Sequence, residues 1–545
     1  MRPIAISPDK DYYYLTMPIK PKTLFVKKPS IFDEAEDLIA PEQLGNPVLP
    51  DPVILSRLFK RITNKTLKNI RPDARRVITR PFRPATESHT GNIVKRVLAL
   101  DEPMVKALLK QTLKDFAHRH KDIQSVLLRN YQKISGYVQE PAACSEERKL
   151  LLGSCFTMEY SIESAALFNP SIVVYPKQNN VQKGQTRVIF SFRATGEGHI
   201  SSIVFRSALI ESDNSIFLES VTPFLGTPEV VLNATYDRGL FKAKLEEMKQ
   251  YSEAAKAIFQ HLPESFTPEE MGRAIDAVRA SNTFAHADID DTIIHIKWLE
   301  ESNYEIFFPH PQLISERVIF PVSQNESNGV EDARFVRFVD DEDGSVTYYA
   351  TYTAYNGREI LPQMIETKDF HHFKISTLNG PMARNKGMAL FPRRINGQYA
   401  MITRSDGENL FLSYSDNIHF WYEGVKIEAP ENPWELVQIG NCGSPLETEK
   451  GWLLLTHGVG PMRKYCIGVS LLDLKDPAKT IGRMEIPLLA PREEEREGYV
   501  PNVVYSCGSI ILNGELIIPY AISDSQSHVA SIPLDELLEK LLKQH

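Results

Sequence analysis

Hydrophobic residues recur at helical spacing near the N-terminus of the chain. Residues 53–70 show this spacing, and residues 91–135 show it most strongly. The apolar stripe within the second segment consists of Val105, Leu108, Leu109, Leu113 and Phe116. Asp101 precedes Pro103, as an N-cap precedes a proline in the first helical turn. The pattern predicts two or three helices, each with an apolar face to cover, after a Pro-rich and extended segment at residues 1–50.

After about residue 155 the pattern changes to short β-rich runs separated by Gly, Asn, Asp and Pro. These runs are Ser171–Tyr175, Arg187–Phe192, Ser201–Ser207, Tyr304–Phe308, Phe335–Val339, Thr347–Tyr352, Gln398–Thr403, Leu410–Tyr414, Trp452–Thr456, Ile467–Leu472, Val503–Cys507 and Glu515–Tyr520. Short strands with frequent turns are typical of a β-sandwich, a barrel or a propeller. The length of this part, 156–537, is too great for one sandwich and suits a propeller of about five four-stranded blades.

Two segments of the second part are helical in pattern. Residues 239–281 read as two helices, and Thr267 with Glu270 forms a capping box at the start of the second one. Residues 534–545 form a short amphipathic helix at the C-terminus.

We therefore expect a mainly β protein, a five-bladed β-propeller with an N-terminal α-helical extension and a helical insertion. The expected domains are an extended and helical region at 1–155 and a propeller at 156–537, interrupted at about 239–281 and followed by the helix at 534–545.

The composition is that of an ordinary globular protein. Of the 545 residues, 42% are hydrophobic and 24% are charged, which excludes wholesale disorder. No run of about 18 apolar residues exists, so we expect no membrane span. The N-terminal sequence lacks the apolar core of a signal peptide, which favours a cytosolic protein.

The five cysteines form no Cys-x-x-Cys pair, which argues against a metal centre or a disulfide framework. Buried thiols are the simplest reading, and a cysteine nucleophile stays open.

Charge is distributed unevenly along the chain. Residues 1–150 hold 27 Lys and Arg against 17 Asp and Glu, a net +10, while the remainder holds 35 against 53, a net −18. The stretch from Arg57 to Arg96 has 12 basic residues and only two acids. Nucleic-acid binding is one reading of such a stretch. Phe59 and Phe82 are the only Phe, Tyr or Trp residues in it, too few to alternate with the basic residues, so we expect no nucleic-acid partner and favour docking of a basic segment on an acidic domain or on a second subunit.

Five polar clusters stand inside or beside the β runs, spaced about as propeller blades are. They are Phe168–Ser171 with Phe192–Ala194, Glu326–Arg334, Asn385–Pro392 with Arg404, Thr456–Tyr465, and Tyr520–Asp524. The inner ends of propeller blades converge on one axial face, so these clusters can meet in one pocket. Carboxylates with aromatic residues suit a sugar, and added Arg, Lys and His suit a sugar together with an anion.

Several motifs, read in order, resemble those of glycoside hydrolase family 130, the five-bladed propeller mannoside phosphorylases and mannosidases. The motifs are FNPS with FSFRA, GVEDARF, YTAYNG, NKGMALFPRRINGQYAMITR, GNCGSPLET, THGVGPMRKY, LLDLKDPAKTIGR, VPNVVYSCG and PYAISD. The resemblance covers about residues 160–537 and leaves out residues 1–150.

This resemblance implies an inverting reaction on β-linked mannosides, in which Asp332 is the proton donor. A hydroxyl of the bound mannose relays the proton, and inorganic phosphate attacks the opposite face of the anomeric carbon. The implied sugar-binding residues are Asn169, Ser171, Glu331, Tyr355, Asn356 and Asp524. The implied phosphate-binding residues are Arg193, Lys386, Arg404, His457 and Tyr465, with Arg206 as a further candidate. Structural alternatives are a turn position for Asp332 or Asp524 and a core position for His457.

The sequence departs from the family pattern at Ala333, Thr456 and residues 521–525, which leaves the linkage and the acceptor sugar open.

Three functions are compatible with the sequence. The first is a β-mannoside phosphorylase that releases mannose 1-phosphate, with phosphate as co-substrate and no cofactor or metal. The second is an inverting β-mannosidase in which a carboxylate such as Asp524 activates water. The third is a non-catalytic propeller that binds glycans or proteins. The cations favour the first, and the N-terminal helices are expected to support homo-oligomers.

Overall fold

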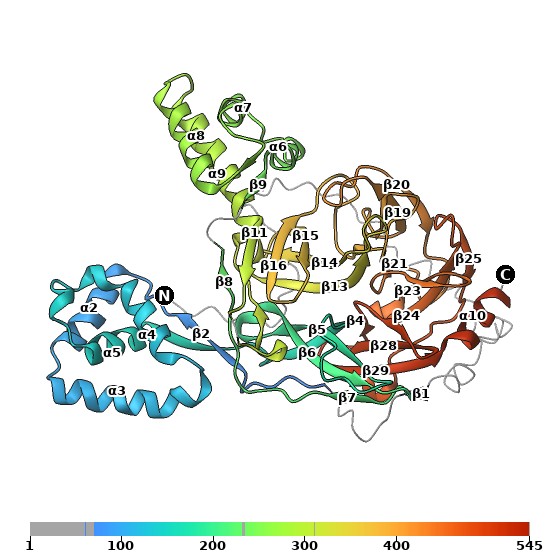
Figure 1. Cartoon of the computed structure of the whole chain (residues 1–545), viewed down its shortest axis with the longest axis horizontal. Coiled ribbons are helices and arrows are strands. Elements are labelled where there is room, and N and C mark those ends of the chain that lie inside the picture. The colour runs from blue at the N-terminus through green and yellow to red at the C-terminus, as the bar shows by residue number, and fades with distance from the viewer. Residues whose placement is uncertain (1–59, 62–69, 232–234, 310, 544–545) are drawn as a thin grey trace, which may run out of the picture. The chain divides into compact units, whose positions relative to one another are not determined.

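The computed structural model of the chain describes residues 60–61, 70–231, 235–309 and 311–543 (Figure 1). The chain divides into residues 1–51, all outside these ranges, and residues 52–545. The described residues are mainly β, with helices before, within and after the strands, and none of the sheets they form is closed. The predicted class, mainly β, is confirmed.

The largest sheet joins strands from residues 166–377. In sheet order they are β4 (Ala166–Val174), β5 (Thr186–Thr195), β6 (Ser201–Ile210), β13 (Gly329–Val339), β14 (Val346–Tyr355), β15 (Ile360–Thr367), β16 (His372–Thr377), β11 (Tyr304–Phe307) and β8 (Glu229–Val230), with β7 (Ile216–Leu218) and β12 (Val318–Ile319) on β6. All neighbours are antiparallel except β6 and β13, which meet in parallel where Gly329 lies opposite Ser201. Gly329 has a φ of 138°, and an added Cβ would lie 2.7 Å from Ser201, so this close approach requires glycine.

Three further antiparallel sheets follow along the chain. Their strands are β17 (Ala389–Leu390), β18 (Tyr399–Thr403), β19 (Leu410–Ser415) and β20 (Gly424–Glu428); then β21 (Gln438–Asn441), β22 (Leu446–Thr448), β23 (Gly451–Val459), β24 (Tyr465–Leu472) and β25 (Thr480–Arg483); and last β26 (Val504–Tyr505), β27 (Ile510–Leu512), β28 (Glu515–Ile522) and β29 (Gln526–Pro533), to which β1 (Lys60–Arg61) is added. Two small pairs join β2 (Val77–Pro81) to β3 (Thr157–Ser161) and β9 (Tyr236–Asp237) to β10 (Ser265–Phe266). Every strand-forming run predicted from the sequence contains a strand.

Helices fill residues 87–155. They are α2 (Glu87–Leu98), α3 (Glu102–Phe116), α4 (Ile123–Gln132) and α5 (Glu146–Cys155). Asp101 caps α3 as expected, because its Oδ1 accepts the Met104 N–H at 2.8 Å. The predicted stripe is buried only in part. Val105 and Leu109 are buried, whereas Leu108 and Phe116 are about two-fifths exposed.

The helical insertion is longer than the sequence indicated. It contains α6 (Arg238–Glu247), α7 (Glu253–Gln260), α8 (Pro268–Ala280) and α9 (His286–Ser302), so the prediction of two helices within 239–281 is wrong in number and extent. The capping box of Thr267 and Glu270 is present at the start of α8. These helices share a core of their own, which includes Phe241, Phe259 and Phe266. At the C-terminus, α10 (Leu534–Lys543) covers the predicted helix except for its last two residues, which lie outside the described ranges.

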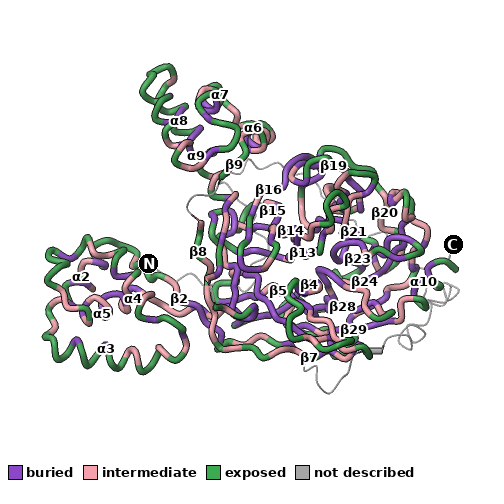
Figure 2. The backbone as a smooth tube through the Cα atoms, in the orientation of Figure 1, coloured by how far each residue is buried: buried purple, intermediate pink, exposed green. Residues whose placement is uncertain are grey.

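Burial follows the strands, whose residues form the purple segments of the backbone in Figure 2. Phe205, Phe335, Phe370 and Phe373 form the centre of the largest core, with ring centroids 5.6–6.2 Å apart. This packing gives the loops between strands a rigid base.

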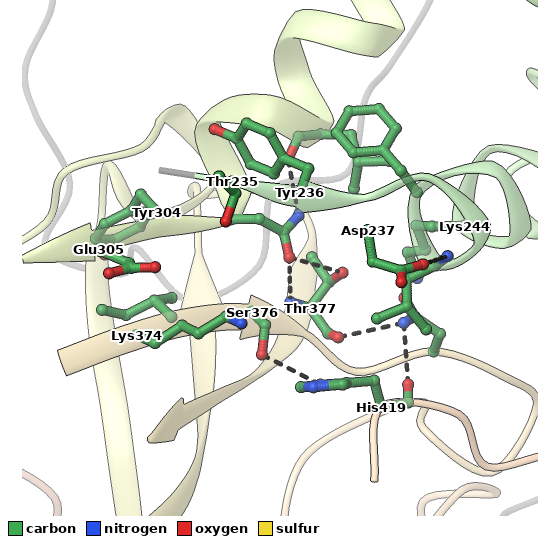
Figure 3. Close-up of a pocket in the computed structure, with 16 residues that line it drawn as sticks. Thr235, Tyr236, Asp237, Lys244, Tyr304, Glu305, Lys374, Ser376, Thr377 and His419 are labelled. Atoms are coloured by element: carbon green, nitrogen blue, oxygen red, sulfur yellow. Dashed lines mark hydrogen bonds between the residues drawn. The ribbon is translucent and has the colours of Figure 1, made fainter. Parts of the chain in front are cut away.

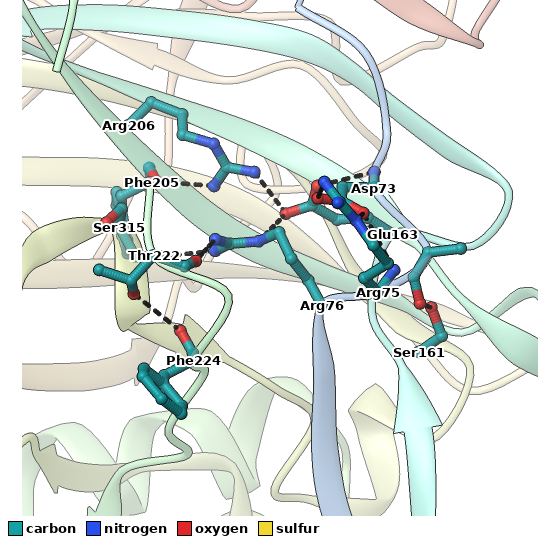
Figure 4. Close-up of polar contacts among 11 residues, drawn as sticks. Asp73, Arg75, Arg76, Ser161, Glu163, Phe205, Arg206, Thr222, Phe224 and Ser315 are labelled. Carbon is teal, nitrogen blue, oxygen red and sulfur yellow. Dashed lines mark hydrogen bonds and ion pairs between the residues drawn. The ribbon is translucent and has the colours of Figure 1, made fainter. Parts of the chain in front are cut away.

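A buried ion cluster ties the segment before α2 to the largest sheet (Figure 4). Glu163 is fully buried, and its Oε1 accepts from Arg76 Nε at 2.9 Å and from Arg206 Nη2 at 2.5 Å. Arg76 also donates to the main-chain oxygens of Thr222 and Ser315. Arg206 therefore compensates a buried carboxylate, which corrects its sequence-based assignment as an anion ligand.

Most of residues 53–70, predicted to be helical, lie outside the described residues. Where the structure describes this segment, it is not helical: Lys60–Arg61 form strand β1, and Ile70 makes an isolated bridge to Ser527. The predicted extended segment at 1–50 also lies outside the described residues. Among the described helices, none is both long and apolar enough to cross a bilayer.

Candidate active site

Two β-bulges lie at the centre of the candidate site. In β13 the register shifts between Glu331 and Arg334, and in β4 it shifts between Phe168 and Ser171. Each bulge holds a residue in the left-handed region, Asp332 with φ 56° and Asn169 with φ 48°. Bulges redirect side chains, and Asn and Asp accept this conformation more readily than most residues. The two bulges meet, because Asn169 Nδ2 donates to Asp332 Oδ1 at 2.7 Å.

Glu331 and Asp332 share the guanidinium of Arg193, which extends from β5. Arg193 Nη2 lies 2.6 Å from Glu331 Oε1, and Nη1 lies 3.4 Å from Asp332 Oδ1. The Arg193 Nε donates to Ser201 Oγ at 2.8 Å, which fixes the plane of the guanidinium. The other oxygen of Glu331, Oε2, accepts from Lys386 Nζ at 2.7 Å. Glu331 therefore holds two of the predicted cations beside Asp332.

Lys386 is the most accessible of these groups, with two-fifths of its side chain exposed. Its ammonium also lies 5.8 Å from the centroid of the Tyr355 ring, within the range of a cation–π contact. Tyr355 thus lies beside the site at the end of β14.

Three residues of the site, Arg334, Asn441 and Tyr505, were not predicted from the sequence. Arg334 donates through Nη2 to Tyr505 OH at 2.6 Å and through Nε to Asn441 Oδ1 at 3.1 Å. Asn441, fully buried, donates to the main-chain oxygen of Gly387, next to Lys386, at 2.5 Å. All three stand in motifs that carried the resemblance, GVEDARF, GNCGSPLET and VPNVVYSCG. Attention to polar residues inside these motifs could have found them.

Arg404 and His457 form a second polar pair. Arg404 Nη1 lies 3.3 Å from His457 Nε2, and His457 Nδ1 lies 3.0 Å from the main-chain oxygen of Asn441. A guanidinium can only donate, so Nε2 accepts and Nδ1 carries the proton. Burial and the nearby guanidiniums of Arg404 and Arg334 hold the pKa of His457 well below its usual value. His457 is therefore neutral and orients Arg404 without adding charge.

Tyr465 lies next to this pair. Its ring stacks on the His457 ring with centroids 6.1 Å apart, and its hydroxyl accepts from Arg463 Nη2 at 3.0 Å. Tyr505 approaches His457 from another direction, with centroids 4.8 Å apart. The two tyrosines form aromatic walls around the imidazole.

Asp524 lies in the turn between β28 and β29. Ser523 and Asp524 both have positive φ, 44° and 48°, as the central residues of a type I′ hairpin turn do. Burial raises the pKa of Asp524 to about 7, against the attraction of Arg193, and the negative charges of Asp332 and Glu331 raise it further. Asp524 is therefore close enough to interact electrostatically with the bulge in β13.

Asp332 behaves in the opposite way. Burial acts to raise its pKa, but Arg193, Arg334, the Asn169 amide and Lys386 outweigh this effect, so the pKa lies below its ordinary value. In the free site Asp332 is thus a carboxylate, and Asp524 is the group that holds a proton near neutral pH.

Two predicted sugar contacts are engaged in the scaffold. Ser171 is fully buried, and its Oγ accepts the Phe335 N–H at 3.2 Å. Asn356 Oδ1 accepts the N–H groups of Arg358 and Glu359 in the turn after β14. The structure therefore brings Asp332, Asn169, Glu331, Arg193 and Lys386 together, whereas these two side chains support the surrounding backbone.

The balance of charge in the site is positive. Arg193, Lys386, Arg334 and Arg404 are cations, and Glu331, Asp332 and the partly protonated Asp524 are the nearby carboxyl groups. Among the described residues, Arg334 and Arg404 form no ion pair with a carboxylate. Such a site can bind an anion next to a carboxyl group. No group of three or more potential metal ligands occurs within the described ranges.

Known proteins match part of the chain, and the family match includes Asp332 and Lys386 but not Asn169 or Arg193. Residues 284–543 match the sequence pattern of a family described as beta-1,4-mannooligosaccharide phosphorylase. A 1,2-beta-oligomannan phosphorylase of Thermoanaerobacter is 34% identical over 40% of this chain and 74% of its own length. A beta-1,2-mannobiose phosphorylase of the same organism is 36% identical over 42% of this chain and 73% of its own.

Among solved structures, a Listeria innocua beta-1,2-mannobiose phosphorylase in complex with beta-1,2-mannobiose aligns with a TM-score of 0.42 at 19% identity. The alignment covers 70% of this chain and 93% of that chain.

Proposed function

Because the chain belongs to glycoside hydrolase family 130, we propose that it is an enzyme that cleaves β-linked mannosides by inverting phosphorolysis, with release of mannose 1-phosphate. The substrates are β-1,2-linked or related manno-oligosaccharides, as the names of its relatives indicate. Phosphate is the co-substrate, and the proposal includes no cofactor.

In this reaction Asp332 is the proton donor. Its proton passes through a hydroxyl of the bound mannose to the glycosidic oxygen, and a phosphate oxygen attacks the anomeric carbon from the opposite face. The carbon–oxygen bond to the leaving sugar breaks as the carbon–phosphate-oxygen bond forms, so the configuration inverts. Phosphate is already an anion, so no second carboxylate is needed as a base.

One observation carries the phosphorylase proposal over a hydrolase. Arg404 is largely enclosed, its Nε has no hydrogen-bond partner among the described residues, and it forms no ion pair there. Arg334 lies close enough to lower the pKa of Arg404 further, after burial. Enclosed cations that lack a counter-charge are costly unless an anion compensates them. A phosphate between these guanidiniums would remove that cost.

The same phosphate would prepare Asp332 as an acid. In the free site the cations keep Asp332 ionised. A dianion placed between Arg404 and Arg334 offsets the charge of Arg334 and raises the pKa of Asp332, because like charges disfavour ionisation. Phosphate binding before proton transfer is therefore part of the proposal.

A hydrolase on the same scaffold is the second candidate, and Asp524 favours it. Its pKa of about 7 lies where a general base or acid works best at neutral pH. In that reaction Asp524 would take a proton from the attacking water.

We further propose that the sheets form a five-bladed propeller over residues 156–537. The support is that the strands group into β4–β6, β13–β16, β17–β20, β21–β25 and β26–β29, each an antiparallel unit. The region 1–155 and the helix at 534–545 stay predicted additions to this domain. The cytosolic location, the absence of a nucleic-acid partner and homo-oligomer formation through the N-terminal helices also stay predictions.

The test is to incubate the protein with β-1,2-mannobiose with and without phosphate and to follow the products by chromatography. We expect mannose 1-phosphate and mannose, formed only when phosphate is present. Free mannose formed equally fast without phosphate would instead identify a hydrolase.

An Asp332→Asn variant tests the proton donor. We expect its kcat/KM to fall by about 10²–10⁴-fold, the usual contribution of a general acid. Asp341→Asn, at an exposed position beyond the end of β13, is the matched control and should keep full activity. Unchanged activity of Asp332→Asn would contradict the assignment.

A further inference from the structure

A cavity lies between the helical insertion and the outer strands β11 and β16, and the space free of protein atoms within it, open solvent included, is about 600 Å³ (Figure 3). Ligand pockets have volumes of about 300–1,000 Å³. Tyr236, Asp237, Phe241 and Lys244 line it from the insertion. Glu305, Lys374, Ser376, Asn379 and His419 line it from the side of the sheet. The insertion thus builds half of a pocket that the reaction site does not use.

Asn379, one of the residues that line the cavity, has a side-chain acceptor without a donor among the described residues. The residue is 2% exposed, and its Nδ2 donates to the main-chain oxygens of Thr377 at 3.2 Å and His419 at 2.9 Å. These two acceptors fix the orientation of the amide. Its Oδ1 has no hydrogen-bond partner among the described residues. A buried acceptor without a donor costs about 1–3 kcal/mol, so a ligand with a hydroxyl or N–H group would be favoured here.

The ionic groups of the cavity nearly cancel. Lys244 Nζ lies 3.3 Å from Glu247, and Glu305 lies 2.7 Å from His372. Lys374 and Asp237 carry opposite charges. Burial, aided by Lys374, lowers the pKa of His419 to about 4, so its ring is neutral and lies 3.3 Å from Ser376 Oγ. Because its positive and negative charges nearly cancel, the cavity disfavours a free ion. It offers a neutral ligand both hydrogen-bond donors and hydrogen-bond acceptors.

Aromatic rings form the wall on the insertion side. The rings of Tyr236 and Phe241 pack edge to face, with centroids 5.7 Å apart, and Phe241 is buried. An apolar ring surface opposite a few fixed polar groups is the composition that binds a sugar, whose C–H faces are apolar and whose edges carry hydroxyls.

The cavity is joined to the reaction site through one segment of chain. The Gly380 N–H donates to Glu247 Oε2 at 2.9 Å, which ties α6 to the loop that follows β16. Asn379 stands at the start of this loop, and Lys386 stands further along it. A ligand in the cavity would therefore contact the same loop that carries a cation of the reaction site.

From these contacts we propose that the cavity binds a hexose unit of a mannoside outside the reaction site. The choice of mannose rests on the proposed function. The choice of a neutral, hydroxyl-rich ligand rests only on the cavity.

Histidine side chains provide a reporter for each site. Full-length protein labelled with ¹³C at histidine Cε1 is titrated with mannose and, separately, with inorganic phosphate, without turnover. The resonances of His419 and His457 are assigned from His419→Gln and His457→Gln variants. We expect mannose to shift the His419 resonance in a saturable way, and phosphate to leave it in place.

Two variants and a control sharpen the test. Ser376→Tyr fills the cavity and should abolish the shift of His419, and Lys374→Ala removes an exposed ammonium and should weaken mannose binding several-fold. Lys368→Ala changes an exposed lysine in the turn between β15 and β16 and should leave mannose binding unchanged. A His419 resonance that does not respond to mannose, responds to phosphate, or shifts equally in correctly folded Ser376→Tyr would overturn the proposal.

The readout separates this inference from the proposed function. Phosphorolysis of β-1,2-mannobiose without a response of His419 would defeat the cavity proposal alone. A cavity-dependent response of His419 in a protein that does not release mannose 1-phosphate would defeat the proposed function alone.

Discussion

Asp332 and Asp524 share one site and have opposite pKa shifts. Both are enclosed, so desolvation acts on both in the same direction. The difference lies in their partners: Asp332 accepts from Asn169 and faces Arg193 and Arg334, whereas only Arg193 counteracts the burial of Asp524. A pair of carboxyl groups whose pKa values are pushed apart is the arrangement from which acid and base roles are assigned.

The raised pKa of Asp524 predicts a stability that falls with rising pH. Between about pH 4 and pH 7 the folded protein binds a proton at Asp524 that the unfolded chain releases, so stability decreases across this window. Each pKa unit corresponds to about 1.4 kcal/mol. An Asp524→Asn variant should therefore be more stable than the wild type at pH 8 and nearly equal to it at pH 4, as measured by urea unfolding at both values. The exposed Asp341→Asn variant is the control, and an Asp524→Asn protein less stable than wild type at pH 8 would refute the prediction.

The candidate site could be predicted from the sequence where a motif places charged residues side by side. Glu331 and Asp332 are neighbours in GVEDARF, and the structure places Lys386 and Arg193 against Glu331. Asn441 and Tyr505 were missed because their role depends on contacts with Arg334, which lies more than 100 residues away in the chain. For His457 the sequence suggested a possible cation, and only its burial and its hydrogen bonds make it neutral.

Strand positions were predictable because the β-rich runs end at turn formers, but the bulges were not. Nothing in the letters of FNPS or GVEDARF specifies that two residues face one across the ladder at Asn169 and Asp332. The helices of the insertion were underestimated because α9 ends in Trp298–Ser302, directly before a strand, without a clear stop signal. On α3 the stripe was predicted as a face to be covered, yet Leu108 and Phe116 are exposed, because α5, the α-helix that packs against α3, covers only part of that face.

The buried ion cluster of Arg76, Glu163 and Arg206 joins the residue before β2 to strand β6 of the largest sheet. Glu163→Gln would leave the guanidiniums of Arg76 and Arg206 buried without a counter-charge. We expect a loss of about 3–5 kcal/mol in the free energy of unfolding, measured by urea titration. Arg75→Gln, which breaks the exposed pair of Arg75 and Asp73, is the control and should change the free energy of unfolding far less, because solvent screens an exposed ion pair. Equal losses in the two variants would contradict the view that Glu163 is the anchor.

Across the whole protein, ion pairs between the basic N-terminal part and the acidic later part explain some of the uneven charge of the sequence. The basic N-terminal part makes buried or half-buried pairs with acidic residues of the later part, such as Arg76 with Glu163 and Lys121 with Glu316. The acidic later part nevertheless concentrates cations at its reaction site. Net charge over long segments therefore predicted an association between the two parts, and it gave no indication of the local charge where chemistry is proposed.

That local positive charge predicts a coupling between phosphate and global stability. An anion that binds only the folded protein stabilises it by mass action, by about 2.7 kcal/mol at a concentration 100 times its Kd. We expect inorganic phosphate to raise the Tm of the wild type. We expect Arg404→Gln to lose most of this increase, because the Arg404 guanidinium is an enclosed cation that forms no ion pair among the described residues. Arg337→Gln, an exposed arginine on the same strand as Arg334, controls for loss of positive charge and should retain the full increase. Sodium chloride at matched ionic strength separates specific binding from screening. If Arg404→Gln and Arg337→Gln respond to phosphate alike, the anion does not bind at Arg404, and the observation that favours phosphorolysis over hydrolysis loses its force.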